Sequence, residues 1–540
     1  MANLILKEGA NPNYLATICQ IGETHAIEGA DKIQKVVING YDMVISKEMK
    51  TGDIVVYFPI ESAISEKYLS ANNLYEISEY ERNSNMKEVA AILAKAEGLI
   101  GSGKAKEGKS VKDEAKKMVG FFNKRGRVRI LKLRGISSEG FVAGVDSLEK
   151  AYPSLVGTDW NSLIGTKFNY VDDEELCWKY IPPIKVVEPQ TNGKQGFFKK
   201  RMKRLKRFDK LIPGTFVFHY DTKKLNECID ALSPQDIVTI SVKVHGSSLI
   251  LANIPIKKKL SLWAKIKKAF GRKVELTEYG NIYSSRHVIK NQYINPKAND
   301  QSFYESDIFG CVNRDFAQYL DNDMTVYGEV VGYLEGSATM IQKDHDYGAA
   351  VGEWKFMPYR ITTLNEDGTK KEWNLGDVLG WTLRLKSEHP ELEKKILPVD
   401  ILYHGRLMDL YPDIPVDEHW HENLLARMKT DTDLLGMELK EPMCHLYEKE
   451  ATAALEVLNA AIAENQPKKS IDKLRAEYEK WESMRAPREG VVIRIDDDPT
   501  AEAWKLKTEA HFHREAKLHD EGVVDMEEAE ELMSEQQTEE

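Results

Sequence analysis

The sequence lacks the marks of a membrane protein and of a disulfide-stabilised protein. Among its 540 residues no apolar run approaches the ~20 residues of a transmembrane helix, and its start, MANLILKEGANPNY, has neither the basic residues nor the long apolar stretch of a signal peptide. The five cysteines are far apart and form no CxxC pair. Disulfide frameworks, zinc ribbons and a membrane partner are therefore not expected, and the cytoplasm is the predicted location.

Positive charge is concentrated in two segments. Residues 525–540 carry eight acids and no base, which accounts for most of the net charge of −11. In the near-neutral remainder, lysines and arginines gather in blocks 194–207 and 257–273, with aromatic residues between them and no acid. Such blocks are often solvated surface, but this pattern favours a polyanion, and nucleic acid above all.

The 257–273 block also has apolar residues at helical spacing around Trp263. This spacing predicts a short amphipathic helix. The block lies between Lys243 and Arg286, two candidate site residues. We therefore expect the helix beside the rim of the site that contains them.

The chain length predicts two or three domains, and the pattern changes along it. Short β-type runs separated by turns such as Asn39-Gly40 predict a small barrel at the start, and irregularly alternating strands and helices later favour an α+β domain with antiparallel sheets. The predicted segments are a small β-barrel (1–180) with a helical insertion near 84–118, a basic linker (181–207), an α+β domain (208–520) with insertions at 255–275 and 447–485, and a disordered acidic tail (521–540). The 447–485 insertion predicts a helical hairpin with its turn at 465–467.

One lysine stands at an unusual place in the second domain. Residues 237–249 are IVTISVKVHGSSL, in which a β-branched run ends at Lys243 before a small-residue turn. Burying an unpaired ammonium is costly, so this lysine is either an edge-strand residue that reaches water or a functional amine.

Four more stretches combine an apolar, strand-like run with charged residues: YSSRHVIKN (283–291), VYGEVVGY (326–333), REGVVIRID (488–496) and AWKLKT (503–508). Each alone is more typical of a strand-end surface charge. Together they supply a nucleophilic amine, the carboxylates Glu329 and Glu489 for a hard cation, and Lys505 and Lys507 for phosphate. Nucleotidyl transfer needs this set.

In this order the stretches resemble the motifs of the covalent nucleotidyltransferases, which include ATP-dependent DNA and RNA ligases and mRNA capping enzymes. The matching motifs are KVHG, SSRHVIKN, YGEVVG, FMPYRI, EGVVI and KLK. His245 resembles the phage RNA ligase 2 and editing-ligase branch. The N-terminal HAIEGADKIQKVVING and LRGISSEGFVAG and the later ILPVDILYHG are similar to Deinococcus-type RNA ligases, which carry an OB domain before the transferase domain.

The resemblance implies a fold and a reaction. The fold is an N-terminal OB-like barrel followed by an antiparallel α+β nucleotidyltransferase domain. The reaction uses ATP as AMP donor with Mg²⁺ or Mn²⁺, passes through a lysyl–AMP intermediate, and seals a 3′-hydroxyl to a 5′-phosphate in nicked or broken RNA. The basic blocks 194–207 and 257–273 are then candidate RNA contacts, and a monomer is expected.

The resemblance also implies site roles. The catalytic residues are Lys243, Glu489, Lys505 and Lys507. The nucleotide- or phosphate-binding residues are His245, Gly246, Arg286, Glu329, Tyr359, Lys505 and Lys507. Glu489 and Glu329 are the metal candidates, Lys243 is the nucleophile, Glu329 binds the ribose, Tyr359 stacks on adenine, and Arg286 holds the RNA end or its phosphate.

Two departures and two alternatives remain open. Val242 stands where many relatives have a glutamate, and Arg360 where an aspartate is usual. The alternatives are a DNA ligase or guanylyltransferase of the same superfamily, and a non-catalytic RNA-binding protein. The pairs His419/His421 and His511/His513 share a face if extended, but they have no nearby third ligand in the sequence, so ordinary surface or core histidines are expected.

Overall fold

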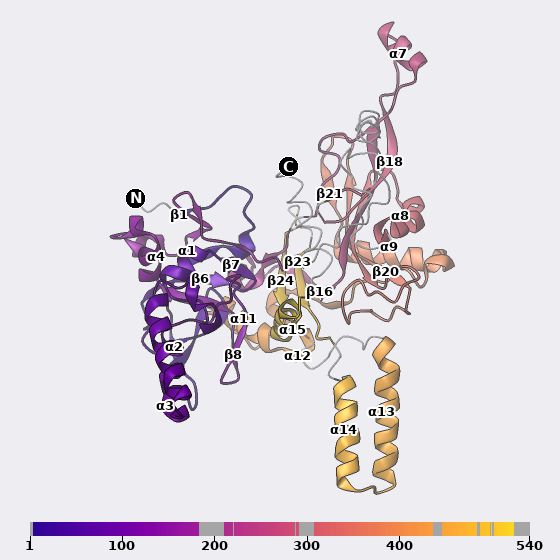
Figure 1. Ribbon diagram of the computed structural model, residues 1–540. Coiled ribbons are helices and arrows are strands. Elements are labelled where there is room, and N and C mark those ends of the chain that lie inside the picture. The colour runs from indigo at the N-terminus through magenta and orange to yellow at the C-terminus, as the bar shows by residue number, and fades with distance from the viewer. Residues whose placement is uncertain are drawn as a thin grey trace, which may run out of the picture. The chain divides into compact units, whose positions relative to one another are not determined.

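The protein, in a computed structural model, divides into two compact units, Met1–Ile181 and Pro182–Glu540 (Figure 1). The structure describes residues 4–182, 210–219, 221–286, 288–290, 307–435, 445–482, 486–496, 498 and 502–522, with the side chains of 445–448 and 482 excepted. The basic block 194–207, nearly all of the predicted linker and most of the acidic tail lie outside these residues. Within the described ranges, every helix is too short or too polar to span a bilayer.

The first unit is built from short antiparallel strands. One sheet has the order β10-β6-β2-β11 and another the order β3-β4-β5. These strands are β2 (Ala16–Gln20), β3 (Thr24–Ala26), β4 (Ile33–Ile38), β5 (Tyr41–Ser46), β6 (Ile54–Pro59), β10 (Gly140–Gly144) and β11 (Lys167–Phe168). Asn39 and Gly40 both have positive φ, as a tight hairpin turn between β4 and β5 requires. The predicted β-type runs are confirmed.

The predicted helical insertion in this unit is also confirmed. It forms a hairpin of α2 (Met86–Gly101) and α3 (Ala105–Lys117). A side chain at Gly108 would come within 2.8 Å of the Ala96 carbonyl oxygen, so the absence of one lets the two helices approach closely.

The second unit contains two five-stranded sheets. The first has the order β15-β24-β23-β16-β22 and the second the order β18-β17-β19-β20-β21. The first comprises β15 (Lys223–Lys224), β16 (Ile237–Lys243), β22 (Ile401–Arg406), β23 (Gly490–Ile495) and β24 (Ala503–Lys507). The second comprises β17 (Ser247–Lys257), β18 (Thr277–Ser284), β19 (Met324–Gly332), β20 (Trp354–Leu364) and β21 (Lys370–Glu372). All strand pairs are antiparallel except β15 with β24, which confirms the predicted sheet type.

Helices bury one face of each sheet. Helices α8 (Ile308–Phe316) and α9 (Leu375–Glu388) pack on the second sheet, where Phe316, Phe356 and Trp381 share one core. Helix α11 (Trp420–Thr430) packs on the first sheet, where Trp420 and Trp504 share another. Only residues 244–246 separate β16 from β17, so this turn connects the two sheets directly.

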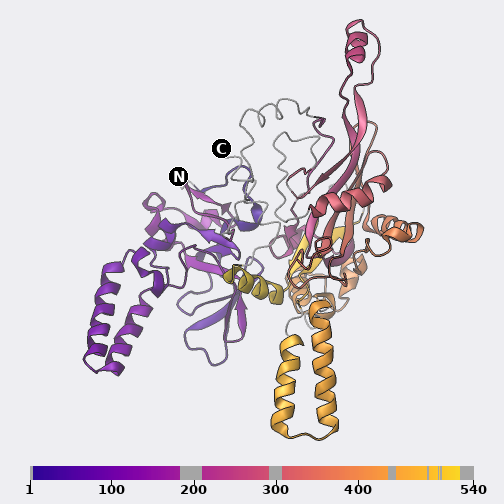
Figure 2. The same cartoon turned by 45° about the vertical axis from the view of Figure 1, so that its right-hand side comes forward.

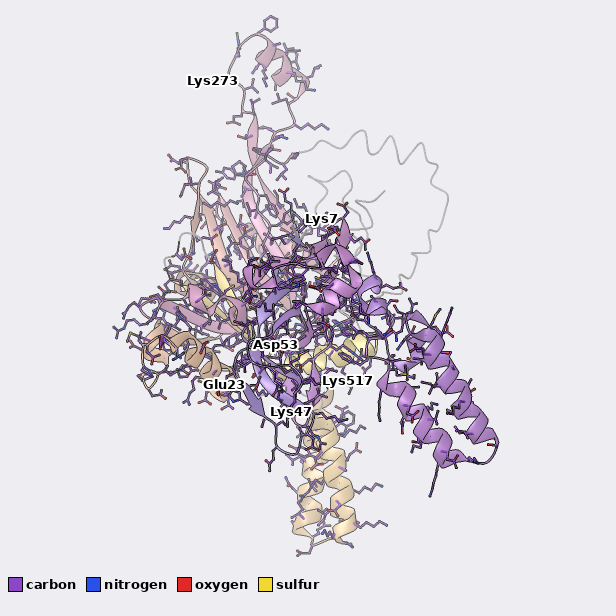
Figure 3. All side chains as sticks on the ribbon, turned by 90° about the vertical axis from the view of Figure 1, so that its left-hand side faces the viewer. Lys7, Glu23, Lys47, Asp53, Lys273 and Lys517 are labelled. Atoms are coloured by element: carbon purple, nitrogen blue, oxygen red, sulfur yellow. The ribbon has the colours of Figure 1, made fainter. Side chains whose placement is uncertain are left out.

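Helix α7 (Leu262–Ala269) confirms the predicted helix in the 257–273 block, but its expected place beside the site is wrong. It stands at the end of the β17–β18 hairpin, away from the body of the unit (Figures 1 and 2), and Lys273 lies on the same projection (Figure 3). From Ser247 to Lys257 an extended strand spans about 30 Å. Trp263 is 74% exposed and Phe270 is 81% exposed. The helical spacing therefore predicted the helix correctly, but it did not predict where in the fold the helix lies.

The predicted hairpin at 447–485 is confirmed. Helix α13 (His445–Ala463) and helix α14 (Lys468–Glu482) pack side by side, and Asn465 has the positive φ of a tight turn between them.

Candidate active site

Strand register brings three charged side chains to one edge of the first sheet. Lys243 ends β16 and pairs with Gly490 of β23, which in turn pairs with Lys507 at the end of β24. Glu489 comes directly before Gly490. A lysine, a glutamate and a second lysine therefore meet where three neighbouring strands end.

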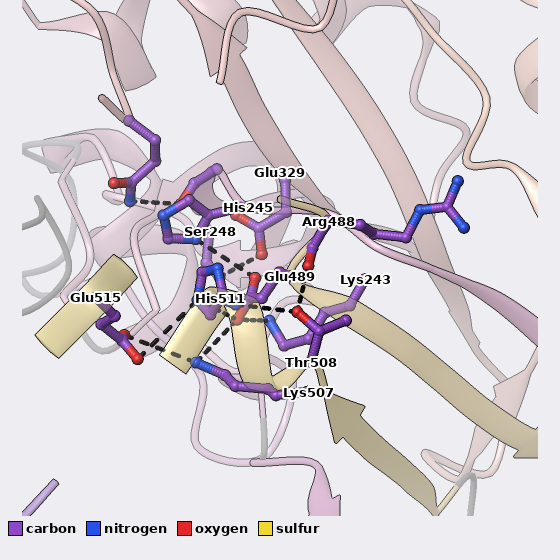
Figure 4. Close-up of polar contacts among 12 residues, drawn as sticks. Lys243, His245, Ser248, Glu329, Arg488, Glu489, Lys507, Thr508, His511 and Glu515 are labelled. Carbon is purple, nitrogen blue, oxygen red and sulfur yellow. Dashed lines mark hydrogen bonds and ion pairs between the residues drawn. The ribbon is translucent and has the colours of Figure 1, made fainter. Parts of the chain in front are cut away.

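Glu489 is the centre of this group (Figure 4). It is 3% exposed, and its Oε1 lies 2.9 Å from Nζ of Lys243 and 3.0 Å from Nζ of Lys507. Burial opposes ionisation of this carboxyl, but the charges of Lys243 and Lys507 outweigh burial and hold its pKa well below the usual range. Glu489 is therefore a buried carboxylate that bridges two lysines.

The backbone fixes Glu489 at this position. The Thr508 amide donates to the Glu489 carbonyl at 2.9 Å, and the Thr508 hydroxyl donates to the Arg488 carbonyl at 2.8 Å. A side chain at Gly490 would lie 2.0 Å from the Leu506 carbonyl oxygen, so only glycine lets β23 and β24 meet here. Glycine therefore follows Glu489 for a steric reason.

Thr508 also begins helix α15 (Glu509–Asp520). Its hydroxyl accepts from the His511 amide at 3.1 Å, a typical N-cap contact. This cap fixes the first turn of the helix directly after β24, and His511, 2% exposed, faces Glu489 from that turn.

The second sheet contributes Glu329. Ser248 of β17 lies opposite Glu329 of β19, and its hydroxyl donates to Oε1 of Glu329 at 3.0 Å (Figure 4). A side chain at Gly246 would lie 2.7 Å from the Val330 carbonyl oxygen, so glycine lets the connecting turn pass close to β19. His245 and Gly246 thus connect the Lys243 strand end to β17 and pass close to β19, the strand of Glu329.

Residues with no sequence signal hold this turn. The His245 amide donates to the Tyr347 hydroxyl at 2.7 Å, and the Gln342 side-chain amide donates to the Gly246 carbonyl at 3.0 Å. Both come from residues 333–353, between β19 and β20, which matched no motif. Their role depends on a loop that returns to the site, which local sequence pattern does not show.

Histidines gather beside Glu489, and the two members of the His511/His513 pair have different surroundings. The two lie on a helix, where neighbours two apart point in different directions. His511 joins His245 and Glu489 in a group whose possible ligand atoms all lie within 4.8 Å of one another. His245 and Glu489 are distant from His511 in the sequence, so spacing along the chain did not indicate this group. The His419/His421 pair keeps ordinary roles: His419 lies near Glu418 and Glu422, and His421 near the Leu232 carbonyl.

This group fits a divalent cation. Oε2 of Glu489 and both ring nitrogens of His511 are buried and have no hydrogen-bond partner among the described residues. Burial lowers the pKa of His511 well below its usual value, so the ring is a neutral imidazole, the form that binds metal. Glu329, the second predicted metal carboxylate, is not part of this group.

Lys505 lies on the same strand as Lys507, two residues before it. Burial, followed by the charges of Lys507 and Lys243, lowers its pKa to about 7. Its ammonium is thus placed where an anion would stabilise it.

The remaining predicted residues lie around aromatic rings. The Tyr359 ring makes an edge contact with His219 at 5.4 Å between centroids, and Arg494 donates to the Tyr359 carbonyl at 3.1 Å. Arg286 forms an ion pair with Asp221. Burial, with the charges of nearby arginines, lowers the pKa of His219 well below its usual value.

Arg360, at the position where an aspartate is usual, has a structural partner. It is 4% exposed, pairs with Glu372 of the neighbouring strand, and lies 4.3 Å from the Tyr327 ring centroid. The departure from the motif therefore places an ion pair between β20 and β21.

Comparison with known proteins gives the following similarities. An OB-fold domain model matches residues 15–88, which confirms the predicted N-terminal OB fold. No curated protein matches the sequence. The structure is similar to the Naegleria gruberi RNA ligase with PPi, at 16% identity and a TM-score of 0.46, over 93% of this chain and 99% of that chain. Two mutants of that ligase, one with ATP and Mn and one with AMP and Mn, are 15% identical, with a TM-score of 0.45, over 93% of this chain and 98% of theirs.

Proposed function

We propose that the protein is an ATP-dependent RNA ligase that seals a 3′-hydroxyl to a 5′-phosphate through an adenylate on Lys243. The observation that carries the proposal is the position of Lys243 at a strand end, 2.9 Å from a buried glutamate that also contacts Lys507. The resemblance of the surrounding motifs to those of RNA ligases gives this group of side chains its reaction class. Repair of nicked or broken RNA is the proposed purpose.

In the proposed first step, the neutral amine of Lys243 attacks the α-phosphorus of ATP. The new N–P bond forms as the bond to the bridging oxygen breaks, pyrophosphate leaves, and the lysine loses a proton to solvent. Glu489 positions the amine before the attack, and Lys505 and Lys507 stabilise the negative charge that develops on the α-phosphate. A divalent cation, when bound, would neutralise phosphate charge.

In the second and third steps, the AMP passes to an RNA 5′-phosphate, and the 3′-hydroxyl of the other end then displaces AMP to form the phosphodiester bond. Glu329 is proposed to hold the ribose, Tyr359 to stack on adenine, and Arg286 to hold the RNA end. His245 and Gly246 are proposed to line the nucleotide pocket at the turn between the sheets. We include the cytoplasm in the proposal because the five cysteines are far apart in the sequence and form no CxxC pair.

Labelled nucleotides test the first step. The protein should become labelled by α-labelled ATP with a divalent cation, and Lys243→Ala should abolish labelling. Lys243→Arg should also fail, because a guanidinium stays protonated at working pH. Lys223→Ala is the matched control, since Lys223 lies in the same sheet in an exposed pair with Glu502. Labelling of Lys243→Ala at the wild-type level would overturn the assignment.

Sealing assays separate the alternatives. Nicked duplexes with ribose at the 3′ end should be sealed, and those with deoxyribose should be poorer substrates. Preference for deoxyribose would indicate a DNA ligase, and transfer of GMP rather than AMP a guanylyltransferase. RNA binding with no labelling by either nucleotide would indicate a non-catalytic RNA-binding protein.

A further inference from the structure

We propose that His245, Glu489 and His511 bind a divalent transition-metal ion directly, through two imidazoles and one carboxylate. The inference rests on the proposed function in one respect: it specifies the class of metal at the site proposed for the ligase. The ions that fit are Mn²⁺, Co²⁺, Ni²⁺ and Zn²⁺, rather than Mg²⁺.

The two oxygens of Glu489 have different neighbours. Oε1 contacts both Lys243 and Lys507, whereas Oε2 lies 3.4 Å from Nδ1 of His245 and accepts no hydrogen bond from the described residues. A buried carboxylate oxygen without a hydrogen-bond donor is costly. The two lysines therefore pair with Oε1, and a bound cation would supply the missing partner of Oε2.

The buried ring of His511 also lacks hydrogen-bond partners. It is 2% exposed, and neither ring nitrogen has a hydrogen-bond partner among the described residues. Its Nε2 lies 3.9 Å from Oε1 of Glu489 and 4.0 Å from Oε2 of Glu515. A buried imidazole normally satisfies at least one nitrogen, and a metal bond would do so here.

The geometry is close to that of a metal site. With metal–nitrogen distances of about 2.0 Å, two ligands of one tetrahedral ion lie about 3.3 Å apart. The His245–Glu489 pair at 3.4 Å already fits this separation, and the whole group, within 4.8 Å, needs only a small closing movement of side chains.

Neighbouring residues hold the ligands. His345 is buried, its ring centroid lies 4.6 Å from that of His245, and its nitrogens face the carbonyl oxygens of Lys343 (3.0 Å) and Pro487 (3.4 Å). It therefore orients His245 and does not serve as a ligand. Such support around the ligating side chains is typical of metal centres.

The donor set decides the class of ion. Mg²⁺ prefers oxygen ligands and keeps much of its water, whereas imidazole suits Co²⁺, Ni²⁺ and Zn²⁺; Mn²⁺ accepts the same donors but binds most weakly of the four in the Irving–Williams series. Two imidazoles and one carboxylate, with room left for water or phosphate, form an open transition-metal site.

Cobalt binding to the full chain tests the proposal without nucleotide. Metal-free protein titrated with Co²⁺ should develop visible absorption that saturates at one ion per chain, and a large excess of Mg²⁺ should not displace that ion. His511→Asn should weaken this binding at least tenfold. His513→Asn is the matched control, because His513 lies on the same helix, faces Glu509 and is outside the group.

Each result decides the proposal. Absence of saturable Co²⁺ absorption, or equal binding by wild type and His511→Asn, would overturn it. If circular dichroism shows that His511→Asn does not fold, His245→Asn carries the same test, since the side chain of His245 is 18% exposed and easier to replace. Labelling of Lys243 by ATP is measured separately. A ligase without the cobalt site, or a cobalt site without ligase activity, would therefore show which proposal has failed.

Discussion

Nζ of Lys243 lies 2.9 Å from Oε1 of Glu489, and this one contact links the strand that ends in the proposed nucleophile to the strand that follows the buried carboxylate. The same oxygen also contacts Lys507 at 3.0 Å. A single carboxylate thus holds two cations at the edge of one sheet. In the proposed reaction, the phosphate of ATP would replace part of this charge pairing.

The first prediction concerns Glu489. Glu489→Gln keeps the shape of the side chain but removes the charge that positions both lysines and supports a cation. Labelling of the protein by ATP should fall by about 10–100-fold, a range typical of disrupted metal sites, and should fall further at low concentrations of the activating divalent cation. The measurement is labelling across a metal titration. Glu502→Gln, in an exposed lysine pair beside the same sheet, is the control. A metal titration identical to that of the wild type would remove Glu489 from the metal site.

The second prediction concerns Gly246. In Gly246→Ala the new methyl group would lie 2.7 Å from the Val330 carbonyl oxygen and 2.8 Å from a Val331 methyl, so the turn must move away from β19. We expect the free energy of unfolding to fall by about 1–3 kcal/mol, as for other overpacked sites, and labelling by ATP to fall with it.

Urea denaturation measures this change, and Gly380→Ala is its control. Gly380 lies within α9 with open space around it, so alanine there should stabilise the protein by about 0.5–1 kcal/mol. Equal stability of the two alanine variants would show that the turn has room for a side chain.

Much of the site could be predicted from the sequence because its residues lie at the ends of strands with strong local patterns. The β-branched run before Lys243, the Glu489-Gly490 pair and the alternating Lys505 and Lys507 each form the strand or strand end that was expected. Register in an antiparallel sheet then brings these ends together, so local pattern and motif order carried most of the information.

The rest depends on contacts between distant segments. Tyr347 and Gln342 reach the turn from a loop without a motif, and His511 reaches Glu489 because Thr508 begins a helix directly after β24. The extended conformation assumed for the His511/His513 pair hid this possibility. Similarly, the helical spacing around Trp263 predicted a helix but not its place at the tip of a long hairpin.

The third prediction concerns the pH dependence of stability. The pKa of Lys505 is lowered to about 7, chiefly by burial, whereas an unfolded lysine titrates near ~10.4. Below about pH 7 the lysine is charged in both states, so the folded state bears the full cost of a charge that is partly buried and repelled by Lys507 and Lys243. From about pH 7 to 10 the unfolded state binds more protons, and stability rises with pH.

Lys505→Met tests this by removing the charge. The variant should be more stable than the wild type at pH 6, and the difference should shrink as the pH rises toward 9. Urea denaturation at pH 6, 7.5 and 9 measures it. A difference that does not change with pH would mean that Lys505 titrates normally in the folded protein.

The last prediction concerns α7, which we expect to bind RNA and to take no part in lysine chemistry. Its lysines Lys265, Lys267 and Lys268 project from the tip of the β17–β18 hairpin, and the exposed Trp263 lies on the same short helix, so cations and an aromatic ring are presented together. Each phosphate contact releases counterions and steepens the dependence of affinity on salt, and an exposed tryptophan can stack on an unpaired base.

Replacing the three lysines by alanine should weaken RNA binding and reduce the slope of log affinity against log salt by about 1 for each phosphate that the helix no longer neutralises. Self-labelling by ATP, which involves no RNA, should stay near the wild-type level because α7 lies far from Lys243. The matched control is Lys468, Lys469 and Lys473 to alanine, which makes the same charge change on the exposed surface of α14. Filter binding at several salt concentrations measures both variants. Equal slopes for the α7 variant and the wild type would show that α7 is a solubilising surface, and an unchanged RNA slope with weaker binding to anionic vesicles would assign it to a membrane surface instead.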